Sequence, residues 1–405
     1  MKVLLKALKY MGISVLVLIL AIGAVLLYLW LRPNAAFINP ELQMETWDAV
    51  KDGMHNSNTH MIYWKNEFWL VHANSPYHFA TPKCKLMVWH SSDARQWQKA
   101  TEVRVPGEDI RDPKFAVIKG KLILYVLKSI RFEAEPYRTA YTFTTDGTTW
   151  APLKDIMDQE GWLFWNPKST DGTTWYVPVY WYEHGQSALL TSEDGERWIL
   201  VSIIHNGRNE QTGFNDRNDE TDIEFLPDSR MISTQRMEGS DSFFGDKTAC
   251  TNLTISSPPY TSWTELGKDY TTRLDGPALF SYHGRVYAVG RSNPYKPGPG
   301  NYYGSIFAKK RTSLFLVIEK GLVYLSDLPS AGDTAYEGVV IRGEDIYISY
   351  YTSDVTKDWP WLMGMVKASE IRIAKISLPS LEMLALKTLA DYDRHNKYQF
   401  FPATH

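Results

Sequence analysis

The hydrophobic pattern separates a short amino-terminal segment from the rest of the chain. Between Tyr10 and Leu31 no side chain carries a charge, and nearly all are apolar. At about 1.5 Å per residue, a helix of this length spans about 33 Å, which matches the hydrocarbon thickness of a bilayer. The pattern therefore predicts a transmembrane helix. Three lysines precede it, Lys2, Lys6 and Lys9, and by the positive-inside rule they favour a cytoplasmic amino terminus.

We therefore expect two parts in the chain. Residues 1–33 would form a basic stub and a transmembrane signal anchor, and residues 34–405 an extracytoplasmic domain, periplasmic or extracellular. A cleaved signal peptide is the alternative, but its apolar region normally has only about 7–15 residues before a small-residue cleavage site. The weak Ala35-Ala36 pair is the one candidate for such a site. An uncleaved single-pass anchor is the preferred interpretation, with the membrane as one expected partner.

Beyond Asn34 the pattern changes to short aromatic and β-branched runs separated by turn residues, which is typical of β-strands. Six segments share the plan of a strand, a polar turn and a second strand, and they start about 52–60 residues apart, a spacing that indicates β-propeller blades. Residues 42–50 are well placed to add a strand to the last blade and close the ring. The prediction is an all-β, six-bladed propeller. The six segments begin at His60, Asp112, Asn166, Glu220, Gly276 and Tyr336.

A turn motif recurs between these segments. Its form is Ser/Thr-x-Asp-Gly-x-x-Trp, it ends at Trp97, Trp150 and Trp198, and Ala94 replaces the glycine once. In a hairpin turn the Asp side chain folds back on its own backbone, the Gly adopts a positive φ, and the Trp packs into the sheet. The segment 169–175 has the same letters out of phase, and we interpret it as an ordinary hairpin turn.

Composition then narrows the classes of function. The formal net charge of −3 provides no basic surface, so we expect no nucleic-acid partner. The 15 Trp, 24 Tyr and 16 Phe suit sheet packing and also the stacking of sugar rings. No His/Cys motif has metal-ligand spacing and no Gly-rich phosphate loop occurs, so we expect no cofactor. Cys84 and Cys250 are expected to be buried free thiols rather than a bridge.

The start of each innermost strand lies near one mouth of a propeller channel, where ligands usually bind. The six segment starts therefore predict the wall of a pocket, and the end of each following strand returns to the same face. Carboxylates, arginines and a tyrosine converge there, which indicates a candidate active site. The nominated residues are His60, Arg111, Asp112, Trp165, Glu220, Tyr336 and Glu337 from the starts, and Arg236 and Arg291 from the strand ends.

The turn motifs and residues 219–236 together resemble the bacterial sialidase superfamily, over about residues 45–385 in blade order. In that family, whose fold is a six-bladed propeller with Asp-box turns (BNR repeats), a Glu opens one strand and an Arg closes the next. Glu220 and Arg236 resemble that pair, and Arg291 resembles the family's next arginine. Tyr336 resembles its tyrosine nucleophile, and Asp112 its catalytic acid. The resemblance implies a glycoside hydrolase acting on a glycan with an acidic terminal sugar.

These residue types form a consistent chemistry. Planar guanidinium groups such as those of Arg236 and Arg291 can hold a substrate carboxylate with two hydrogen bonds each. A tyrosine is a weak nucleophile at its usual pKa of about 10, so Glu220 would take the proton of Tyr336. Asp112 would protonate the leaving oxygen as a general acid. We expect Arg111, His60, Trp165 and Glu337 to complete the substrate site.

One departure from the family keeps alternatives open. Sialidases have a first arginine in an Arg-Ile-Pro-like motif opening blade one, and residues 56–62 contain none. Arg111, beside Asp112, is one possible substitute for its charge. A five-bladed furanosidase-type enzyme would use Asp112 and Glu220 instead, and a lyase-type propeller would use His60 and Tyr336. A non-catalytic propeller that binds a glycan or a protein is a further alternative, in which the channel arginines simply form ion pairs with neighbouring carboxylates.

Overall fold

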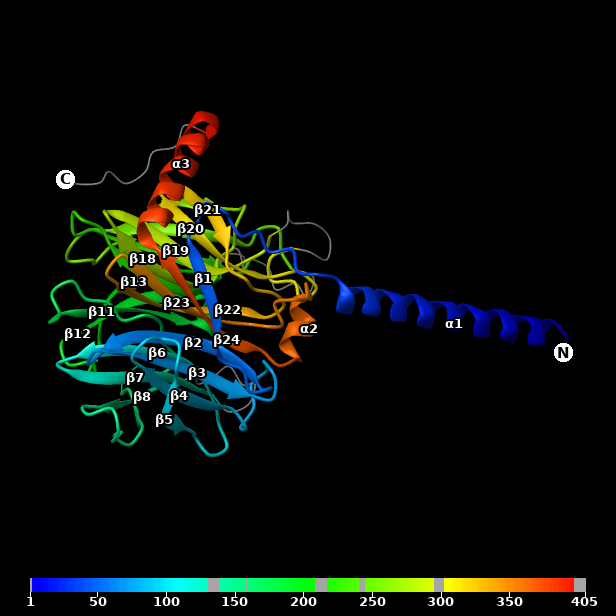
Figure 1. The fold of residues 1–405 in the computed structure, drawn as a ribbon, viewed down its shortest axis with the longest axis horizontal. Coiled ribbons are helices and arrows are strands. Elements are labelled where there is room, and N and C mark those ends of the chain that lie inside the picture. The colour runs from blue at the N-terminus through cyan, green and yellow to red at the C-terminus, as the bar shows by residue number, and fades with distance from the viewer. Residues whose placement is uncertain are drawn as a thin grey trace.

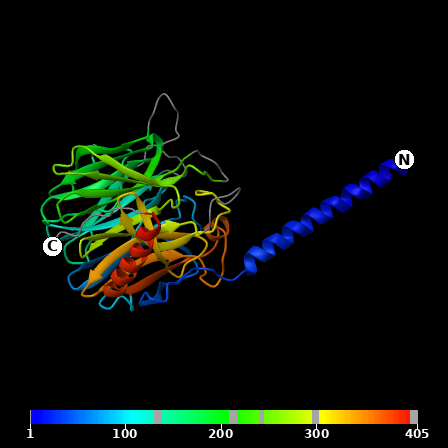
Figure 2. The ribbon, with the colours of Figure 1, turned by 90° about the horizontal axis from the view of Figure 1, so that it is seen from above.

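The computed structural model describes residues 2–129, 138–157, 159–207, 217–239, 245–294 and 302–396. In this part of the chain six four-stranded antiparallel sheets form a ring, and a long helix projects from one side of it (Figures 1 and 2). Innermost strands of neighbouring sheets contact one another around most of the ring. The predicted all-β propeller with six blades is confirmed, which also excludes the five blades that the furanosidase-type alternative requires.

The first three blades follow one another along the chain. Blade one contains β2 (His55–Trp64), β3 (Glu67–Ser75), β4 (Lys85–Ser91) and β5 (Gln98–Val103). Blade two contains β6 (Asp109–Ile118), β7 (Lys121–Ser129), β8 (Arg138–Thr144) and β9 (Lys154–Asp155). Blade three contains β10 (Leu163–Phe164), β11 (Trp175–Trp181), β12 (Gln186–Ser192) and β13 (Ile199–Asn206), with the 3-10 turn η1 (Tyr182–His184).

The last three blades repeat the plan. Blade four contains β14 (Asn218–Phe225), β15 (Met231–Met237), β16 (Cys250–Ser256) and β17 (Thr264–Asp269). Blade five contains β18 (Asp275–Tyr282), β19 (Arg285–Ser292), β20 (Arg311–Ile318) and β21 (Gly321–Asp327). Blade six contains β22 (Thr334–Arg342), β23 (Asp345–Thr352), β24 (Glu370–Ser377) and, from the start of the chain, β1 (Met44–Val50).

Strand β1 closes the ring. It pairs antiparallel with β24, from Met44 opposite Ile376 to Val50 opposite Ile371. The prediction that residues 42–50 complete the last blade is therefore confirmed. This pairing occupies an edge of β24 that would otherwise expose unpaired backbone groups, and it joins distant parts of the chain within one sheet.

The core consists of layers between adjacent blades. Between blades five and six, Tyr287, Leu316 and Ile348 are fully or almost fully buried in one cluster. Helix α3 (Leu378–Asn396) adds Leu381 and Leu384 to this cluster. The helix therefore covers one side of the ring next to the closing blade (Figure 1).

The recurrent turns share one hydrogen-bond pattern. The carboxylate of Asp146 accepts the backbone N–H groups of Thr148 and Thr149, both at 2.8 Å. Asp93 and Asp194 make the equivalent bonds. The out-of-phase turn at Asp171 has the same bonds, so the local sequence, and not the position within a blade, produces this turn. These bonds lower the pKa of Asp146 below its usual range, which indicates a structural carboxylate.

Helix α1 (Lys2–Leu31) is the one described helix that is long and apolar enough to cross a membrane, and none of its most apolar window is buried. By length and composition it is either a membrane span or a signal sequence. Its carboxyl end contacts the propeller: the rings of Trp30 and Trp359 lie 4.9 Å apart, and Arg32 pairs with Asp358. The side chain of Asn34 donates to Val355 O at 2.8 Å.

Candidate active site

The candidate site is built by a backbone irregularity that recurs in the innermost strands. In five blades the pairing of the innermost strand shifts register near its start. Such a bulge re-aims the side chains that it carries. Four of the nominated residues occupy this bulge: Asp112 in blade two, Glu220 in blade four, and Tyr336 and Glu337 in blade six. The residue pairs within the shifts are Asn58 and Thr59, Asp112 and Pro113, Asp219 and Glu220, Gly276 and Pro277, and Tyr336 and Glu337.

The bulge forces an unusual backbone conformation on ordinary side chains. Asn58, Asp112 and Tyr336 have φ angles of 48°, 47° and 55°, and Gly276, at the matching place in blade five, has 62°. A positive φ is strained for a bulky residue such as tyrosine, and such outliers cluster at functional sites. The strands also begin before the segment starts expected from the sequence, because the bulge separates the first few strand residues from the regular pairing.

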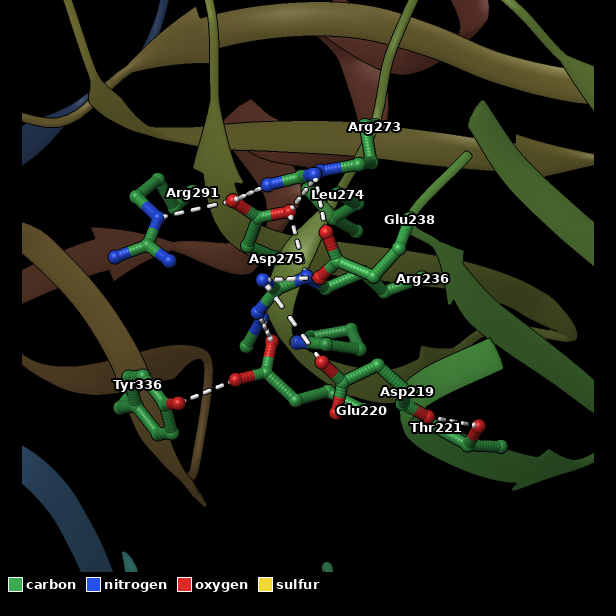
Figure 3. A network of polar contacts seen from close by, with 12 residues as sticks. Asp219, Glu220, Thr221, Arg236, Glu238, Arg273, Leu274, Asp275, Arg291 and Tyr336 are labelled. Atoms are coloured by element: carbon green, nitrogen blue, oxygen red, sulfur yellow. Dashed lines mark hydrogen bonds and ion pairs between the residues drawn. The ribbon is translucent and has the colours of Figure 1, made fainter. Parts of the chain in front are cut away.

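Tyr336 and Glu220 form the centre of the site. The Tyr336 hydroxyl donates a hydrogen bond to Glu220 Oε1 (Figure 3). The other oxygen, Glu220 Oε2, accepts from Arg236 Nη1 at 2.8 Å and from the backbone N–H of Gly276 at 2.6 Å. The Tyr336 ring lies 5.5 Å from the ring of Trp165. Glu220 is therefore fixed by two donors and presents its remaining oxygen to the tyrosine.

The surroundings keep Tyr336 protonated. Burial, followed by the negative charges of Glu220 and Asp112, raises the pKa of Tyr336 well above its ordinary value of 10.0. A free tyrosinate is thus unfavourable at neutral pH. The hydroxyl can become a strong nucleophile only if its proton moves to a base during the attack. Glu220 is the base that already accepts a hydrogen bond from this hydroxyl.

Asp112 has the properties of a proton donor. It is buried, and the side-chain amide of Asn58 donates to its Oδ1. Burial raises the pKa of Asp112 to about 6; Arg111 opposes this shift and Glu220 adds to it. At this pKa about half of the Asp112 side chains carry a proton at pH 6 and about a tenth at pH 7, so the protonated form that a general acid requires is populated below neutrality.

The nominated arginines are already paired with carboxylates. Arg236 contacts Glu220, and its Nε lies 3.3 Å from Asp275 Oδ1. It also pairs with Glu238. Arg291 Nε donates to Asp275 Oδ2 at 3.1 Å. The ion pairs expected for a purely structural channel are therefore present.

Arg273 belongs to the candidate site and was not nominated from the sequence. It is fully buried and binds Asp275 with two hydrogen bonds, of 2.6 and 2.9 Å, and Glu238 with one of 2.9 Å. Together with Arg236 and Arg291 it surrounds Asp275 (Figure 3). The charges of these arginines hold the pKa of Asp275 well below its usual range. Its position two residues before Asp275, on the same face of an extended segment, is the signal that could have found it.

Arg291 keeps one group for a ligand. Its Nη1 is buried and makes no hydrogen bond within the described part of the chain, although Asp333 Oδ1 lies 3.6 Å away. The guanidinium lies 4.5 Å from the ring centre of Trp361. Arg236 also has a buried nitrogen without a hydrogen bond, Nε, but that atom lies closer to a carboxylate, 3.3 Å from Asp275 Oδ1. Of the two nominated arginines, Arg291 is therefore the better placed to receive an additional anion.

A second missed residue is Lys114. Its Nζ lies 3.8 Å from the ring centre of Trp165 and 5.8 Å from that of Tyr336. Burial lowers its pKa to about 8, while Asp112 and other carboxylates raise it. Lys114 follows Asp112 by two residues, so strand alternation was the available signal. It places a buried cation directly behind the tyrosine.

The remaining nominated residues lie around this centre. His60 accepts the backbone N–H of Phe115 at Nδ1, and burial keeps its pKa well below 6.5, so it is neutral. Trp165 is fully buried and donates to Pro277 O at 2.7 Å. Glu337 is buried, which raises its pKa to about 8.

Arg111 lies further out. Its guanidinium pairs bidentately with Asp109 and donates to His78 O at 3.1 Å. Its charge is thus balanced by its own neighbour, which limits it as a substitute for a missing arginine.

Among the described residues, a cavity of about 570 Å³ lies at the hairpin end of the channel, away from Tyr336, and is lined by Lys168, Glu224 and His283 among others.

Cys84 and Cys250 are both buried, and no disulfide joins them. Burial raises the pKa of the Cys84 thiol to about 12. The expectation of two buried thiols rather than a bridge is therefore confirmed.

Comparisons with known proteins agree with this architecture. No protein-family model matches the chain, and no curated protein matches its sequence. A Trypanosoma rangeli sialidase in complex with sialic acid has a TM-score of 0.60 at 11% identity, covering 92% of this chain and 64% of that chain. The endosialidase of phage phi92 has a TM-score of 0.59 at 9% identity, covering 83% and 69%.

This chain thus spans less than two thirds of the length of the T. rangeli sialidase that it matches. At such low identities the similarity concerns the fold. Three features of this chain are observed in addition to that similarity. They are the order of the blades, the bulged innermost strands and the contact between the tyrosine and the glutamate. The chain has the six-bladed β-propeller fold of the sialidases.

Proposed function

We propose that this protein is a membrane-anchored glycoside hydrolase that releases an acidic terminal sugar from a glycan outside the cytoplasm. The observation that carries the proposal is the hydrogen bond from Tyr336 to Glu220 inside a sialidase-like propeller. Tyrosine is a rare nucleophile among glycosidases, and sialidases are the enzymes known to use it. A tyrosine paired with a carboxylate is the arrangement that activates such a nucleophile.

The proposed reaction has two steps. In the first, the Tyr336 oxygen bonds to the anomeric carbon, the glycosidic C–O bond breaks, and the phenolic proton passes to Glu220. Asp112 gives its proton to the leaving oxygen. In the second, a water oxygen displaces the tyrosine from the sugar, Asp112 takes a proton from that water, and Glu220 returns its proton to Tyr336. Two inversions at one carbon retain the configuration of the sugar.

The arginines support an anionic substrate. Arg291 Nη1 is buried without a hydrogen bond in the described residues, so a substrate carboxylate would satisfy it. Arg236, held by carboxylates, is proposed to position Glu220 and to contribute positive charge. We propose that His60, Trp165 and Glu337 shape the wall behind Tyr336, and that Arg111 holds the backbone at His78.

The test is hydrolysis by the purified full chain in detergent. The aryl glycosides would include sialic acid, related keto-acid sugars, uronic acids and neutral furanosides. Turnover of an acidic sugar is expected, with its loss in Tyr336→Phe. Tyr141→Phe is the matched control, because Tyr141 also donates to a glutamate, Glu196 Oε2 at 2.8 Å, but far from the site. Activity that survives Tyr336→Phe would contradict the tyrosine mechanism.

A non-catalytic glycan-binding propeller is the second candidate. It is favoured by the carboxylates that already pair with Arg236 and Arg291. This candidate predicts saturable binding of an acidic sugar by the full chain, with no turnover of any member of the panel. Binding would then be weakened by Arg291→Met and left unchanged by Tyr336→Phe.

A further inference from the structure

A second cluster of reactive side chains lies beside the tyrosine centre. His55 is the first residue of β2, His78 lies between β3 and β4, and Asp333 directly precedes β22. One ligand-type atom from each lies within 4.8 Å of the others. The side chains of His55 and Asp333 are fully buried, and that of His78 is 20% exposed. Two imidazoles and a carboxylate thus point to one place.

The facing atoms have no hydrogen-bond partner outside the cluster. Within the described residues, His55 Nε2, His78 Nδ1 and Asp333 Oδ2 are buried, and none of them bonds to any other group. Asp333 Oδ2 lies 3.2 Å from His55 Nε2 and 2.7 Å from His78 Nδ1, so both ring nitrogens approach the same carboxylate oxygen at ion-pair distance.

The outer atoms of the same side chains are well held. His55 Nδ1 lies 2.7 Å from the carbonyl oxygen of Lys367, which can only accept, so Nδ1 carries a proton; in the neutral imidazole Nε2 then offers its lone pair to a metal. Asp333 Oδ1 accepts from Trp361 Nε1 at 2.7 Å and from the Tyr351 hydroxyl at 3.0 Å. Metal ligands are typically oriented by such outer hydrogen bonds, which leave the inner atoms free.

We propose that His55, His78 and Asp333 bind a divalent transition metal, for which Zn²⁺ is the natural probe. Two histidines and one carboxylate form a common protein ligand set for catalytic zinc. Ligand atoms about 2.0–2.1 Å from a tetrahedral zinc lie about 3.3 Å apart, close to the separation of His55 Nε2 from Asp333 Oδ2. His78 Nδ1 lies only 2.7 Å from the same oxygen, so the partly exposed His78 ring would have to move outward when the ion binds. The remaining position would lie on the partly exposed side of His78.

The location gives the ion a use that rests on the proposed function. Asp333 Oδ1 is 3.6 Å from Arg291 Nη1, the group proposed to receive the substrate carboxylate. An ion held by His55, at the opening of blade one, would supply positive charge where the sialidase superfamily has its first arginine. Metal binding itself does not depend on catalysis, so the two claims can fail separately.

The test measures metal rather than activity. The full chain in detergent is stripped with a chelator, dialysed and titrated with Zn²⁺ alone, and bound metal is counted by elemental analysis. One Zn²⁺ per chain and a rise in Tm are expected. His78→Ala, at the least buried ligand, should weaken binding by more than the ~10–100-fold that loss of an outer hydrogen bond costs. His90→Ala is the control, because its ring faces Glu67 at 3.1 Å on the outside of blade one.

Two outcomes would overturn the metal site. One is a folded, stripped chain that shows no saturable Zn²⁺ binding. The other is binding that His78→Ala and His90→Ala affect equally. Circular dichroism of each variant shows whether it is folded, and Asp333→Asn provides a second variant if His78→Ala is not.

A separate observation concerns the orientation of the site. The contacts at the carboxyl end of α1 converge on two neighbouring residues: Asp358 pairs with Arg32, and Trp359 Nε1 donates to Trp30 O at 3.2 Å. Trp361, two residues beyond Trp359, contacts Asp333 and Arg291. Helix α1 leaves the ring on the side of α2 (Trp361–Met365) in both views (Figures 1 and 2).

We infer that the end of the channel bearing Tyr336 faces the surface of the membrane that α1 crosses. This inference rests on the proposed anchor and not on the proposed chemistry. It implies that the site is more accessible to molecules lying at the bilayer surface than to molecules in bulk solution. The opposite, hairpin end of the channel, with its cavity beside Thr170 and Trp175, would face away.

Energy transfer to lipid tests this orientation in the full chain reconstituted in vesicles. A donor dye on Lys83→Cys, an exposed residue between β3 and β4, is expected to transfer more energy to acceptor-labelled lipid than the same dye on Thr173→Cys. Thr173 is exposed in the hairpin that lines the cavity at the other end. The native cysteines are buried and leave little background. Equal or reversed transfer would refute the orientation, and a chain that does not enter vesicles would refute the anchor.

Discussion

Glu337→Gln should stabilise the protein, and by more as the pH rises. Glu337 is buried beside Tyr336, and burial raises its pKa from 4.5 to about 8. Between these values the folded chain keeps a proton that the unfolded chain has lost. Stability therefore falls as the pH rises from 4.5 and stops falling above about pH 8. Glutamine has the shape of the protonated carboxyl and removes this dependence.

The magnitude follows from the shift. Each pH unit between the two pKa values costs about 1.4 kcal/mol, so a span of about 2.5 units up to pH 7 costs about 3 kcal/mol. The free energy of unfolding of Glu337→Gln, relative to the unmodified chain, should thus increase by about 3 kcal/mol between about pH 4.5 and about pH 7.

Urea unfolding followed by tryptophan fluorescence, on the full chain in detergent, measures this difference at each pH. Glu265→Gln is the control, because the Glu265 side chain is 53% exposed and the substitution makes the same chemical change outside the core. A Glu337→Gln difference that stays constant with pH, or that shrinks as the pH rises, would refute the burial argument.

Three further predictions concern charge, proton transfer and turns. Arg273→Met should lower the free energy of unfolding by about 3–5 kcal/mol, because it leaves Asp275 as a buried charge with one partner fewer. Arg230→Met, in an exposed pair, should change the free energy of unfolding by less than about 1 kcal/mol. Equal costs of the two substitutions in urea unfolding would contradict this prediction. Because Asp112 must carry a proton and has a pKa of about 6, kcat/KM should fall as the pH rises through 6; a pH–rate profile that is flat there would exclude it as the acid. Gly147→Ala places a Cβ 2.8 Å from the Trp69 ring, whereas Gly172→Ala, also at positive φ, meets open space. The first should therefore cost about 1–3 kcal/mol more in thermal or urea unfolding, and equal costs would contradict the packing argument.

The fold could be predicted from the sequence because the pattern of strands and turns repeats along the chain. The six strand–turn–strand segments, the turn motifs and the closing strand at residues 42–50 depend on local pattern and on spacing along the chain, and the structure has them, although each innermost strand begins before its expected start. The contact of Tyr336 with Glu220 was also foreseeable, because both open innermost strands.

Contacts between blades were not foreseeable in the same way. The bulge that re-aims Asp112 and Tyr336 leaves no simple mark in the letters. The pairing of Arg236 with several carboxylates depends on how blades four and five meet. His55, His78 and Asp333 come from blade one and from the last connection into blade six, so no ligand spacing along the chain could reveal them.

The central claim is that Tyr336 attacks the sugar, and the most direct measurement is the mass of the trapped protein. The full chain would be incubated with a fluorinated acidic glycosyl fluoride, whose fluorine slows the second step, and then digested and analysed by mass spectrometry. The account predicts one added glycosyl group on the peptide containing Tyr336, absent in Tyr336→Phe and present in Tyr141→Phe. A glycosyl group on Asp112 or Glu220, or turnover of the substrate with no adduct on Tyr336, would contradict it.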